Sequence, residues 1–467
     1  MKLFSQPLEI EALKAICCGD AKISGSVLGR LDESFFFTDL GKEAFARIKF
    51  IAKERTKILT WGELLTDPCL AEEHRESLRA VDPDFNGSAD GLVDNLDSFR
   101  KSRILFDMSE NITNALTQDK VDVNSVLTDI SQMFVKAKTG KNIEDCFTKI
   151  GSGSNIKNDL KEILTGERIR YYKTGYKQWD DKNAGIPIGK LGVIAATTGG
   201  GKSLCINQLA INMALNGIKV CIVPLEMSKE DMLHRFLANR TELDMGQITK
   251  ATDLTKEERQ QAFTAFRAFE KQLAGLNTSI EMFHPDSDMT MEDVLFTLKP
   301  FHFDIIMIDY IGLLGGLDGD NQWKKMMDAA RFAKRWAETN DATVLIAAQL
   351  NQDQVIRYSK GICEHADLMW GWNAGKLCDA VSGQKIIKIE SQKGRNQEQI
   401  AFYLKVDYRK MSMVDATQKE IEDYEAQTKH TLRNQNQNQN MNQTGKSSSG
   451  GSKTQTPGTI DADYADI

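Results

Sequence analysis

The sequence predicts an α/β protein whose core is built on a mainly parallel β-sheet, with an all-helical region before it and a disordered tail after it. Three observations lead to this prediction. Short apolar runs rich in valine and isoleucine alternate with helical segments, a glycine-rich loop follows the first of these runs, and neither end of the chain has this pattern. Strands that alternate with helices need crossover connections, which favour parallel pairing.

The first part of the chain is predicted to be helical throughout. Between about Pro7 and Lys138 the apolar residues recur at helical spacing, as in "EAFARIKFIAKE", and no alternating strand pattern occurs. Around "KIGSGSN" the composition becomes rich in glycine and serine, and the amphipathic stretch "IKNDLKEILTGE" follows. We therefore expect a helical domain over residues 1–145 and a linker with one short helix over residues 146–170.

The core is expected to span residues 171–415. Its candidate strands are "LGVIAA", "KVCIVPLE", "FDIIMIDY", "ATVLIAAQ", "KIIKIE" and "IAFYLKV". After Asp415 the chain has few core-forming residues and passes through "NQNQNQNMNQTGKSSSGG" to the acidic tip "DADYADI". Such a composition buries too little apolar surface to offset the entropy of ordering, so residues 416–467 are predicted to be a disordered tail.

Composition excludes several classes of protein. The chain has 467 residues and a formal net charge of −7, which argues against a globally basic nucleic-acid coat but leaves room for a local basic surface. No apolar run approaches the roughly 20 residues that span a bilayer, and the first residues lack the apolar stretch of a signal peptide. The eight cysteines form no C-x-x-C pair, so neither a zinc ribbon nor a disulfide framework is expected. We expect a soluble cytoplasmic protein with no membrane partner.

The stretch "AATTGGGKSL" is a candidate phosphate-binding loop, although Ala196 stands where the usual G-x-x-x-x-G-K-[S/T] pattern begins with glycine. The loop follows an apolar strand and opens a helical segment, as a phosphate loop must. Its glycines would turn backbone N–H groups toward the phosphates of ATP, Lys202 would neutralise the β- and γ-phosphates, and Ser203 would ligate Mg²⁺. The alternative is a glycine-rich turn without a ligand. The residues expected to bind the nucleotide are Ala196, Thr197, Thr198, Gly199, Gly200, Gly201, Lys202, Ser203 and Leu204.

Three further strand ends carry polar groups suited to phosphoryl transfer. Glu226 follows "KVCIVPL" and could orient and deprotonate the attacking water, although a solvated cap or ion-pair partner is an equally plausible role. Asp309 ends "FDIIMI", where an acid that holds Mg²⁺ through water is expected. Gln349 ends "ATVLIAA", and its amide could sense the γ-phosphate.

Taken in order, these motifs resemble the DnaB-type replicative helicases, ring-shaped motors with a RecA-like P-loop core. The similar stretches are "ATTGGGKS", "PLEMS", "IIMIDYIGLL", "AAQLNQ", "RYSKGICEHADLM" and "SQKGRNQ", and the likeness extends into the helical first domain, over about residues 5–412. The family's phosphate loop often begins with alanine, so Ala196 fits the resemblance. Ala348 and Gln352 depart from the family's usual serine and arginine, which suggests a divergent, phage-like member located in a host cytoplasm.

The resemblance implies roles that local patterns do not reveal. Lys393 and Arg395 would reach the ATP site of a neighbouring subunit, although a solvated basic turn is the local interpretation. Arg235 would approach the nucleotide, whereas an arginine on a helix surface is nearly as plausible. The residues that would grip single-stranded DNA phosphates, in what is otherwise a surface loop, are Arg357, Tyr358 and Lys360.

The implied activity is an ATP-dependent homohexameric helicase that moves 5′ to 3′ and unwinds forked DNA. A primase, a helicase loader and a polymerase are the implied partners, and the acidic tail could tether a basic one, although a purely solubilising tail is as plausible. The short linker helix would dock on a neighbouring subunit or stay an independent surface helix. Two rival classes remain open: a RecA-like recombinase or clock-type ATPase, and a loader-type module that binds ATP but barely hydrolyses it.

Overall fold

The computed structural model describes most of the chain. The described residues are 3–85, 87–117, 123, 126–127, 130, 133, 157–165, 171–197, 199–317, 322–350, 360–372, 383–395 and 397–429. Residues 1–415 form one compact unit and residues 416–467 a second.

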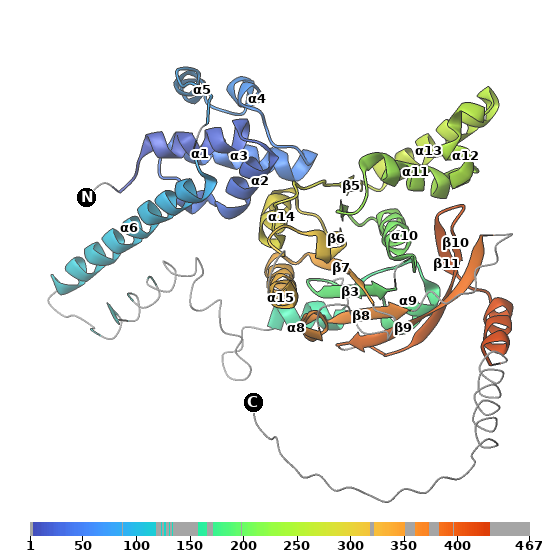
Figure 1. Cartoon of the computed structure of the whole chain (residues 1–467). Helices are drawn as coiled ribbons and strands as arrows, with labels where there is room; N and C mark the ends of the chain where they lie inside the picture. Colours follow the sequence, from blue (N-terminus) through green and yellow to red (C-terminus); the bar gives the residue numbers. More distant parts are fainter. Residues whose placement is uncertain are drawn as a thin grey trace, which may run out of the picture. The chain divides into compact units, whose positions relative to one another are not determined.

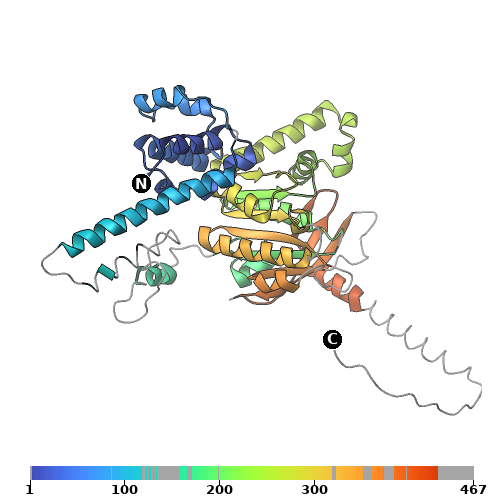
Figure 2. The same ribbon diagram turned by 60° about the vertical axis from the view of Figure 1, so that its left-hand side comes forward.

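The described residues before residue 118 contain helices and no strand (Figures 1 and 2). Side-chain caps define several helix starts: Asp20 accepts a hydrogen bond from the Ile23 amide at 2.8 Å, and Thr60 and Glu63 form a capping box. The helices are α1 (Gln6–Cys18), α2 (Ala21–Arg30), α3 (Asp39–Arg55), α4 (Trp61–Thr66), α5 (Glu72–Arg79) and α6 (Ala89–Leu116). The prediction of an all-helical amino-terminal region is confirmed for these residues. A further helix, α8 (Lys157–Thr165), lies within the range predicted to carry the linker helix.

A nine-stranded sheet forms the centre of the core, in the order β11-β10-β9-β8-β3-β7-β6-β4-β5 (Figure 1). The pairs from β8 through β5 are parallel, while β8–β9, β9–β10 and β10–β11 are antiparallel. The predicted mainly parallel sheet is confirmed. The strands are β3 (Leu191–Ala196), β4 (Val220–Pro224), β5 (Ile280–Met282), β6 (Ile305–Asp309), β7 (Thr343–Gln349), β8 (Leu368–Trp372), β9 (Gln384–Gly394), β10 (Ala401–Asp407) and β11 (Ser412–Asp415). A separate two-stranded sheet pairs β1 (Tyr171–Tyr172) with β2 (Ile186–Pro187).

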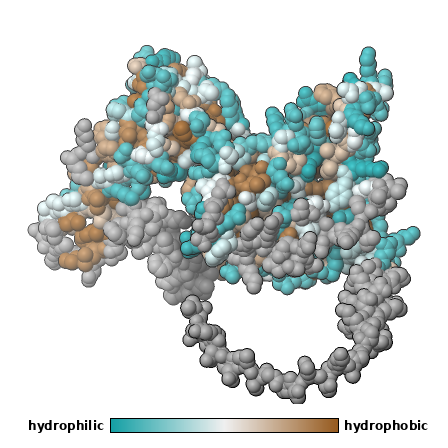
Figure 3. Space-filling model, in the orientation of Figure 1, coloured by the Kyte–Doolittle hydropathy of each residue, from teal (hydrophilic) through white to brown (hydrophobic). Residues whose placement is uncertain are grey.

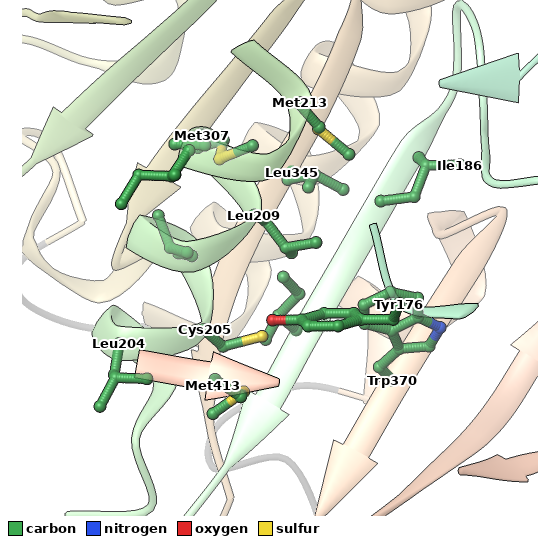
Figure 4. Packing of buried hydrophobic residues seen from close by; sticks show 14 of the residues in the cluster. Tyr176, Ile186, Leu204, Cys205, Leu209, Met213, Met307, Leu345, Trp370 and Met413 are labelled. Atoms are coloured by element: carbon green, nitrogen blue, oxygen red, sulfur yellow. The ribbon is translucent and has the colours of Figure 1, made fainter. Parts of the chain in front are cut away.

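Helices cover both faces of the sheet because successive strand residues point to opposite sides. In β3, Ile194 and Ala196 pack in the cluster that contains the apolar face of α10 (Lys202–Leu215), whereas Val193 and Ala195 pack in the cluster of α14 (Met291–Leu298) and α15 (Gln322–Asn340). Figure 4 shows the first cluster, in which Leu204, Cys205, Leu209 and Met213 of α10 gather with side chains of the sheet. Strands buried on both faces explain why their sequences are continuous apolar runs. The remaining helices are α9 (Lys177–Asn183), α11 (Lys229–Arg240), α12 (Met245–Thr249), α13 (Lys256–Gly275) and α16 (Lys360–His365).

Part of the predicted disordered tail is helical, which corrects the expectation for residues 418–429. The Glu420 carboxylate accepts hydrogen bonds from the Thr417 amide at 2.9 Å and hydroxyl at 2.8 Å, and the Glu420 amide donates back to that hydroxyl at 3.4 Å. This arrangement satisfies orphan donors at a helix start, and charged helix-forming residues follow it. Residues 430–467, including the acidic tip, lie outside the described residues.

No helix among the described residues has the length and apolar character needed to cross a membrane. Hydrophilic side chains cover most of the coloured surface in the view of Figure 3, and hydrophobic ones gather in small patches.

Candidate functional site

The predicted phosphate loop connects β3 to the amino terminus of α10, which is the arrangement that places a helix N-terminus at a bound anion. Gly201 caps the helix in the left-handed region, with φ at 87°. At Gly200 a Cβ atom would lie 2.7 Å from the Thr197 carbonyl oxygen, so only glycine fits the closed loop there. The Gly200 amide donates to that same carbonyl at 2.9 Å. The loop is therefore a compact turn whose backbone leaves room for a phosphate chain.

The structure gives a local reason for the alanine at the start of the motif. Ala196 is the last residue of β3, is fully buried, and pairs with Gln349 of β7 and Trp372 of β8. Ala196 does not have the positive φ that would favour glycine. A strand backbone does not need glycine, and the small methyl group fits beneath Gly200. Ala196 is thus compatible with an intact phosphate loop.

A cleft of about 510 Å³ opens beside this loop, at the carboxyl edge of the parallel strands. Such edges are where open α/β sheets bind ligands, and the volume suits a nucleotide. The cleft brings together eight of the predicted site residues with others that sequence reasoning did not identify, while Asp309 lies beside Ser203 rather than in the lining itself. Its lining is Gly199, Gly201, Lys202, Ser203, Leu204, Glu226, Met227, Asp231, Arg235, Met245, Tyr310, Gln349, Tyr408 and Met411.

The charged groups in the cleft influence one another. Burial lowers the pKa of Lys202, while attraction to Asp309 and then Glu226 opposes that shift. Burial likewise lowers the pKa of Arg235, which Asp309 and Glu226 also attract. Burial raises the pKa of the Asp309 carboxyl above its ordinary value. Asp231, which also lines the cleft, attracts Arg235 as well, so two cations and three carboxylates lie close together in one partly dehydrated site, as expected for a site that holds a polyphosphate and a cation.

Asp309 has the surroundings expected of a residue that helps to hold Mg²⁺. It ends β6, is 4% exposed, and interacts with the Ser203 hydroxyl. Its Oδ1 atom is buried and accepts no hydrogen bond from the residues that the structure describes. A buried carboxylate oxygen without a donor, beside a hydroxyl, is a suitable hard-oxygen position for a hydrated Mg²⁺ ion. These two residues therefore fit the metal role predicted for them.

Glu226 reaches the cleft although its strand is not adjacent to β3. Strands β7 and β6 lie between β3 and β4, and the cleft spans this distance across the sheet edge. Pro224 pairs with Asp309, and the Leu225 amide donates to the Asp309 carbonyl at 2.8 Å, so the Glu226 backbone is held near the metal-site acid. Gln349 enters the same cleft from the end of β7.

Residues 172–368 match the family described as DnaB-like helicase C terminal domain. This match covers the phosphate loop, both acids and Gln349. Residues 172–368 therefore form a DnaB-like helicase domain. The chain is also 29% identical over 196 residues to a probable plasmid replicative DNA helicase of Chlamydia trachomatis, with 40% of this chain and 41% of that protein covered. It is 25% identical over 201 residues to the replicative DNA helicase DnaB of Haemophilus influenzae, covering 41% of this chain and 42% of that one.

The chain thus spans about two fifths of the length of the curated relatives that it matches. Among solved structures, one ATPase domain aligns with 57% of this chain and 99% of its own, at 18% identity and a TM-score of 0.49. A DnaB-like replicative helicase, whose structure was described together with its interactions with primase, aligns with 88% of this chain and 100% of its own, at 16% identity and a TM-score of 0.47. The assignment of the DnaB-like domain depends on the sequence match.

Lys393 and Arg395 lie where the parallel strands β3 and β8 begin, at the end of the sheet opposite the phosphate loop. Both residues also lie beyond the range that matches the family. Gly394, at the end of β9, pairs with Leu368 at the start of β8, which itself lies beside Gly192 near the start of β3. The phosphate loop follows the other end of β3, about 16 Å away at 3.3 Å per residue. An arginine side chain cannot span that distance, so within its own chain Arg395 is remote from the cleft beside the phosphate loop.

Lys393 has a partner in its own chain. It belongs to β9 rather than to a turn, and its ammonium donates to the carbonyls of Cys363 at 2.7 Å and Glu364 at 2.9 Å, near the carboxyl end of α16. A cation at this position satisfies carbonyls that a helix end leaves without partners. Its role toward a neighbouring subunit stays a prediction.

Several predicted residues fall outside what the structure describes. Thr198, Arg357 and Tyr358 are among them, as is the side chain of Lys360, whose backbone begins α16. The Leu204 side chain is 2% exposed and packs in the core, so a contact with nucleotide would have to come from its backbone.

Sequence reasoning also missed Trp372. This residue ends β8, is 3% exposed, and donates from its indole nitrogen to the Gly200 carbonyl at 2.7 Å. This hydrogen bond joins the end of β8 to the phosphate loop of the DnaB-like domain.

Proposed function

We propose that this protein is an ATP-dependent DNA helicase, a homohexameric ring that moves 5′ to 3′ on single-stranded DNA and unwinds the duplex at a replication fork. The observation that carries the proposal is the cleft in which the phosphate loop, Glu226 and the strand-end Gln349 meet, with Asp309 beside Ser203 of that loop. ATP and Mg²⁺ are the proposed ligands of this cleft.

The proposed hydrolysis assigns a separate task to each group. Glu226 orients a water and accepts its proton as the water oxygen attacks the γ-phosphorus and the bond from that phosphorus to the β-phosphate oxygen breaks. Lys202 offsets negative charge on the β- and γ-phosphates. Asp309 and Ser203 would hold Mg²⁺, which when bound neutralises charge on the same phosphates. Gln349 contacts the γ-phosphate and is placed to report its loss.

The apolar part of the cleft lining is suited to the nucleotide base. Tyr408, Met227, Met245 and Met411 make up this part of the lining. An aromatic ring and thioether side chains favour contact with the flat apolar faces of a base. We assign the base to these residues.

Arg395 is proposed to act in a neighbouring subunit. Its distance from its own phosphate loop leaves trans action as the route by which it can stabilise charge in the transition state. Arg357, Tyr358 and Lys360 are proposed to grip DNA phosphates, which predicts weak base preference and binding that falls with salt. A primase, a loader and a polymerase are the proposed protein partners, with the acidic tail as a candidate tether.

Strand displacement on DNA of defined polarity tests the proposal. Duplexes with only a 5′ arm, only a 3′ arm, or both arms should be incubated with ATP and Mg²⁺, with Lys202→Ala as the inactive control. We expect displacement when the 5′ arm is present and DNA-stimulated ATP hydrolysis in every case. Hydrolysis with filament formation but no displacement would favour the recombinase alternative, and nucleotide binding without turnover would favour a loader-type module.

Mixing two inactive variants tests trans action. Arg395→Ala and Glu226→Gln subunits should each lack ATPase alone because they fail on opposite sides of an interface. After subunit exchange, verified with differently tagged chains, some interfaces combine an intact Glu226 with an intact Arg395. A trans arginine contributes about 10³-fold or more, so ATPase should rise measurably above either variant. Exchanged rings that recover no ATPase would exclude this role for Arg395.

A further inference from the structure

Asp367 is a buried carboxylate at the amino edge of the sheet, just before β8, and it lies outside the cleft described above. It is 3% exposed. Its Oδ1 accepts a hydrogen bond from the Lys334 ammonium of α15 at 2.7 Å and lies 3.4 Å from Nη1 of Arg395. Its Oδ2 accepts from the Leu191 amide at the start of β3, at 3.3 Å. One carboxylate thus joins a helix, the strand that leads to the phosphate loop, and the side chain of Arg395.

The backbone of Asp367 reinforces these contacts. Its carbonyl accepts a hydrogen bond from the Arg395 amide at 2.9 Å, and its own amide donates to the Leu191 carbonyl at 2.8 Å. Both the main chain and the side chain of Arg395 are therefore held by the same residue. Asp367 fixes where the arginine leaves the sheet edge and toward which side it extends.

The two cations on this carboxylate differ in distance and exposure. Lys334 is close, and its side chain is 15% exposed, whereas Arg395 is farther away and its side chain is 55% exposed. A buried carboxylate that loses its only counter-ion is strongly unfavourable. Because Lys334 remains paired with Asp367, Arg395 can leave the carboxylate for another anion without leaving a buried charge unpaired. The pair therefore restrains the arginine but also permits its release.

The charges around Asp367 favour movement of the Arg395 side chain toward an anion. Lys334, Lys393 and Arg395 all lie near Asp367, and burial together with repulsion from Arg395 lowers the pKa of Lys393. An edge with more cations than carboxylates attracts a polyphosphate presented by another molecule.

We propose that Asp367, with Lys334 as its permanent counter-ion, is the positioning residue for Arg395, holding the arginine between turnovers and aiming it at the ATP of the neighbouring subunit. This inference rests on the proposed trans action of Arg395. Asp367 contacts neither nucleotide nor water in this scheme, so it acts on the transition state only through the arginine.

The first test is Asp367→Asn, which keeps the shape but removes the charge. We expect the ATPase kcat to fall by about 10- to 100-fold, as for a displaced catalytic group, while the KM for ATP changes little. Lys334→Met should lower kcat in the same way, whereas Lys334→Arg should keep kcat close to the wild-type value.

Asp304→Asn is the matched control. Asp304 also lies at the amino edge of the sheet, where it accepts hydrogen bonds from the Lys219 amide at 2.7 Å and the Tyr172 hydroxyl at 3.4 Å. Its own contacts do not involve Arg395. Its kcat should stay near the wild-type value.

The decisive test is a pattern of complementation that a merely structural role would not produce. Asp367→Asn subunits mixed with Glu226→Gln subunits should recover ATPase, because the first supply Glu226 and the second supply a correctly held Arg395. Asp367→Asn mixed with Arg395→Ala should not recover, since both defects lie on the same side of each interface. Tagged-chain exchange and thermal melting of each variant establish that the rings assemble and the subunits fold.

The outcomes separate this inference from the proposed function. If Arg395→Ala and Glu226→Gln subunits fail to complement each other, the trans role itself is wrong. If that pair complements but Asp367→Asn keeps wild-type kcat, or fails to complement Glu226→Gln, the positioning role is wrong. If Asp367→Asn does not fold, the Lys334→Met variant is mixed in the same two ways, and the same two failures overturn the inference.

Discussion

The indole nitrogen of Trp372 donates a hydrogen bond to the carbonyl oxygen of Gly200, at 2.7 Å. This bond crosses from the end of β8 to the phosphate loop and satisfies a carbonyl that would otherwise be free to turn toward the phosphates. An inward carbonyl would repel them, so the bond favours the orientation in which the loop presents N–H groups.

Trp372→Phe should therefore weaken nucleotide binding while keeping the aromatic packing. The loss of one buried hydrogen bond costs about 1 kcal/mol, which corresponds to a rise in the Kd for ATP of about 5-fold. Trp370→Phe is the matched control, because the Trp370 indole nitrogen is also buried but donates no hydrogen bond to the described residues. Equilibrium binding of a fluorescent ATP analogue measures both. Equal Kd values for the two variants would show that the Gly200 contact does not order the loop.

Glu226→Gln should separate binding from hydrolysis. The amide keeps the size of the side chain but cannot accept the proton of the attacking water, so we expect turnover to fall by about 10²-fold or more with ATP binding retained. Lys202→Ala removes the loop's side-chain cation and should reduce binding and hydrolysis together. Titration calorimetry and single-turnover hydrolysis distinguish the two patterns. Loss of ATP binding in Glu226→Gln would instead indicate a structural carboxylate.

Asp309→Asn should stabilise the protein in the absence of nucleotide and metal while it abolishes Mg²⁺-dependent hydrolysis. Burial raises the pKa of this carboxyl, so the native state binds its proton more tightly than the unfolded chain does. The wild-type protein therefore loses stability as the pH rises from the ordinary aspartate pKa through the raised one, and asparagine does not titrate. At pH 8 we expect the variant's Tm to be higher, on the order of 2 °C, and the difference should shrink toward pH 4.

Differential scanning calorimetry of both proteins between pH 4 and pH 8 measures this difference in Tm. A variant that melts below wild type at pH 8 would mean that the charged Asp309 stabilises the fold, contrary to the raised pKa.

The central sheet could be predicted because its strands are buried on both faces and read as continuous apolar runs. β8 was not predicted, since "LMWGW" is short and contains a glycine that weakens a strand signal. Trp372, which β8 contributes to the site, was missed for the same reason, whereas Tyr408 was missed although it directly follows β10, a strand that was predicted. Their positions beside the phosphate loop follow from the order of strands in the sheet, which no local pattern encodes.

The roles that are proposed to depend on a second subunit could not be predicted from the chemistry of local sequence patterns. Nothing in "SQKGRNQ" indicates that Lys393 binds the end of α16 or that Asp367 holds Arg395, because these contacts join segments about 30 residues apart through β9 and β8. Only the resemblance to a helicase family suggested Arg395 as a catalytic residue, and its remoteness from its own cleft is a property of the fold.

The first and fifth positions of the phosphate loop should respond in opposite ways to a one-carbon change. Ala196→Gly restores the common motif but removes a buried methyl group from a strand, so we expect near-normal ATPase and a loss of about 0.5–1 kcal/mol in stability. Gly200→Ala adds a carbon 2.7 Å from the Thr197 carbonyl and 3.0 Å from the Ala196 side chain. The loop must then open, and ATPase should fall by about 10²-fold. Steady-state ATPase and urea unfolding of both variants test this. A large gain in ATPase for Ala196→Gly would show that alanine impairs the motif, and an active Gly200→Ala would show that the loop does not need its closed turn.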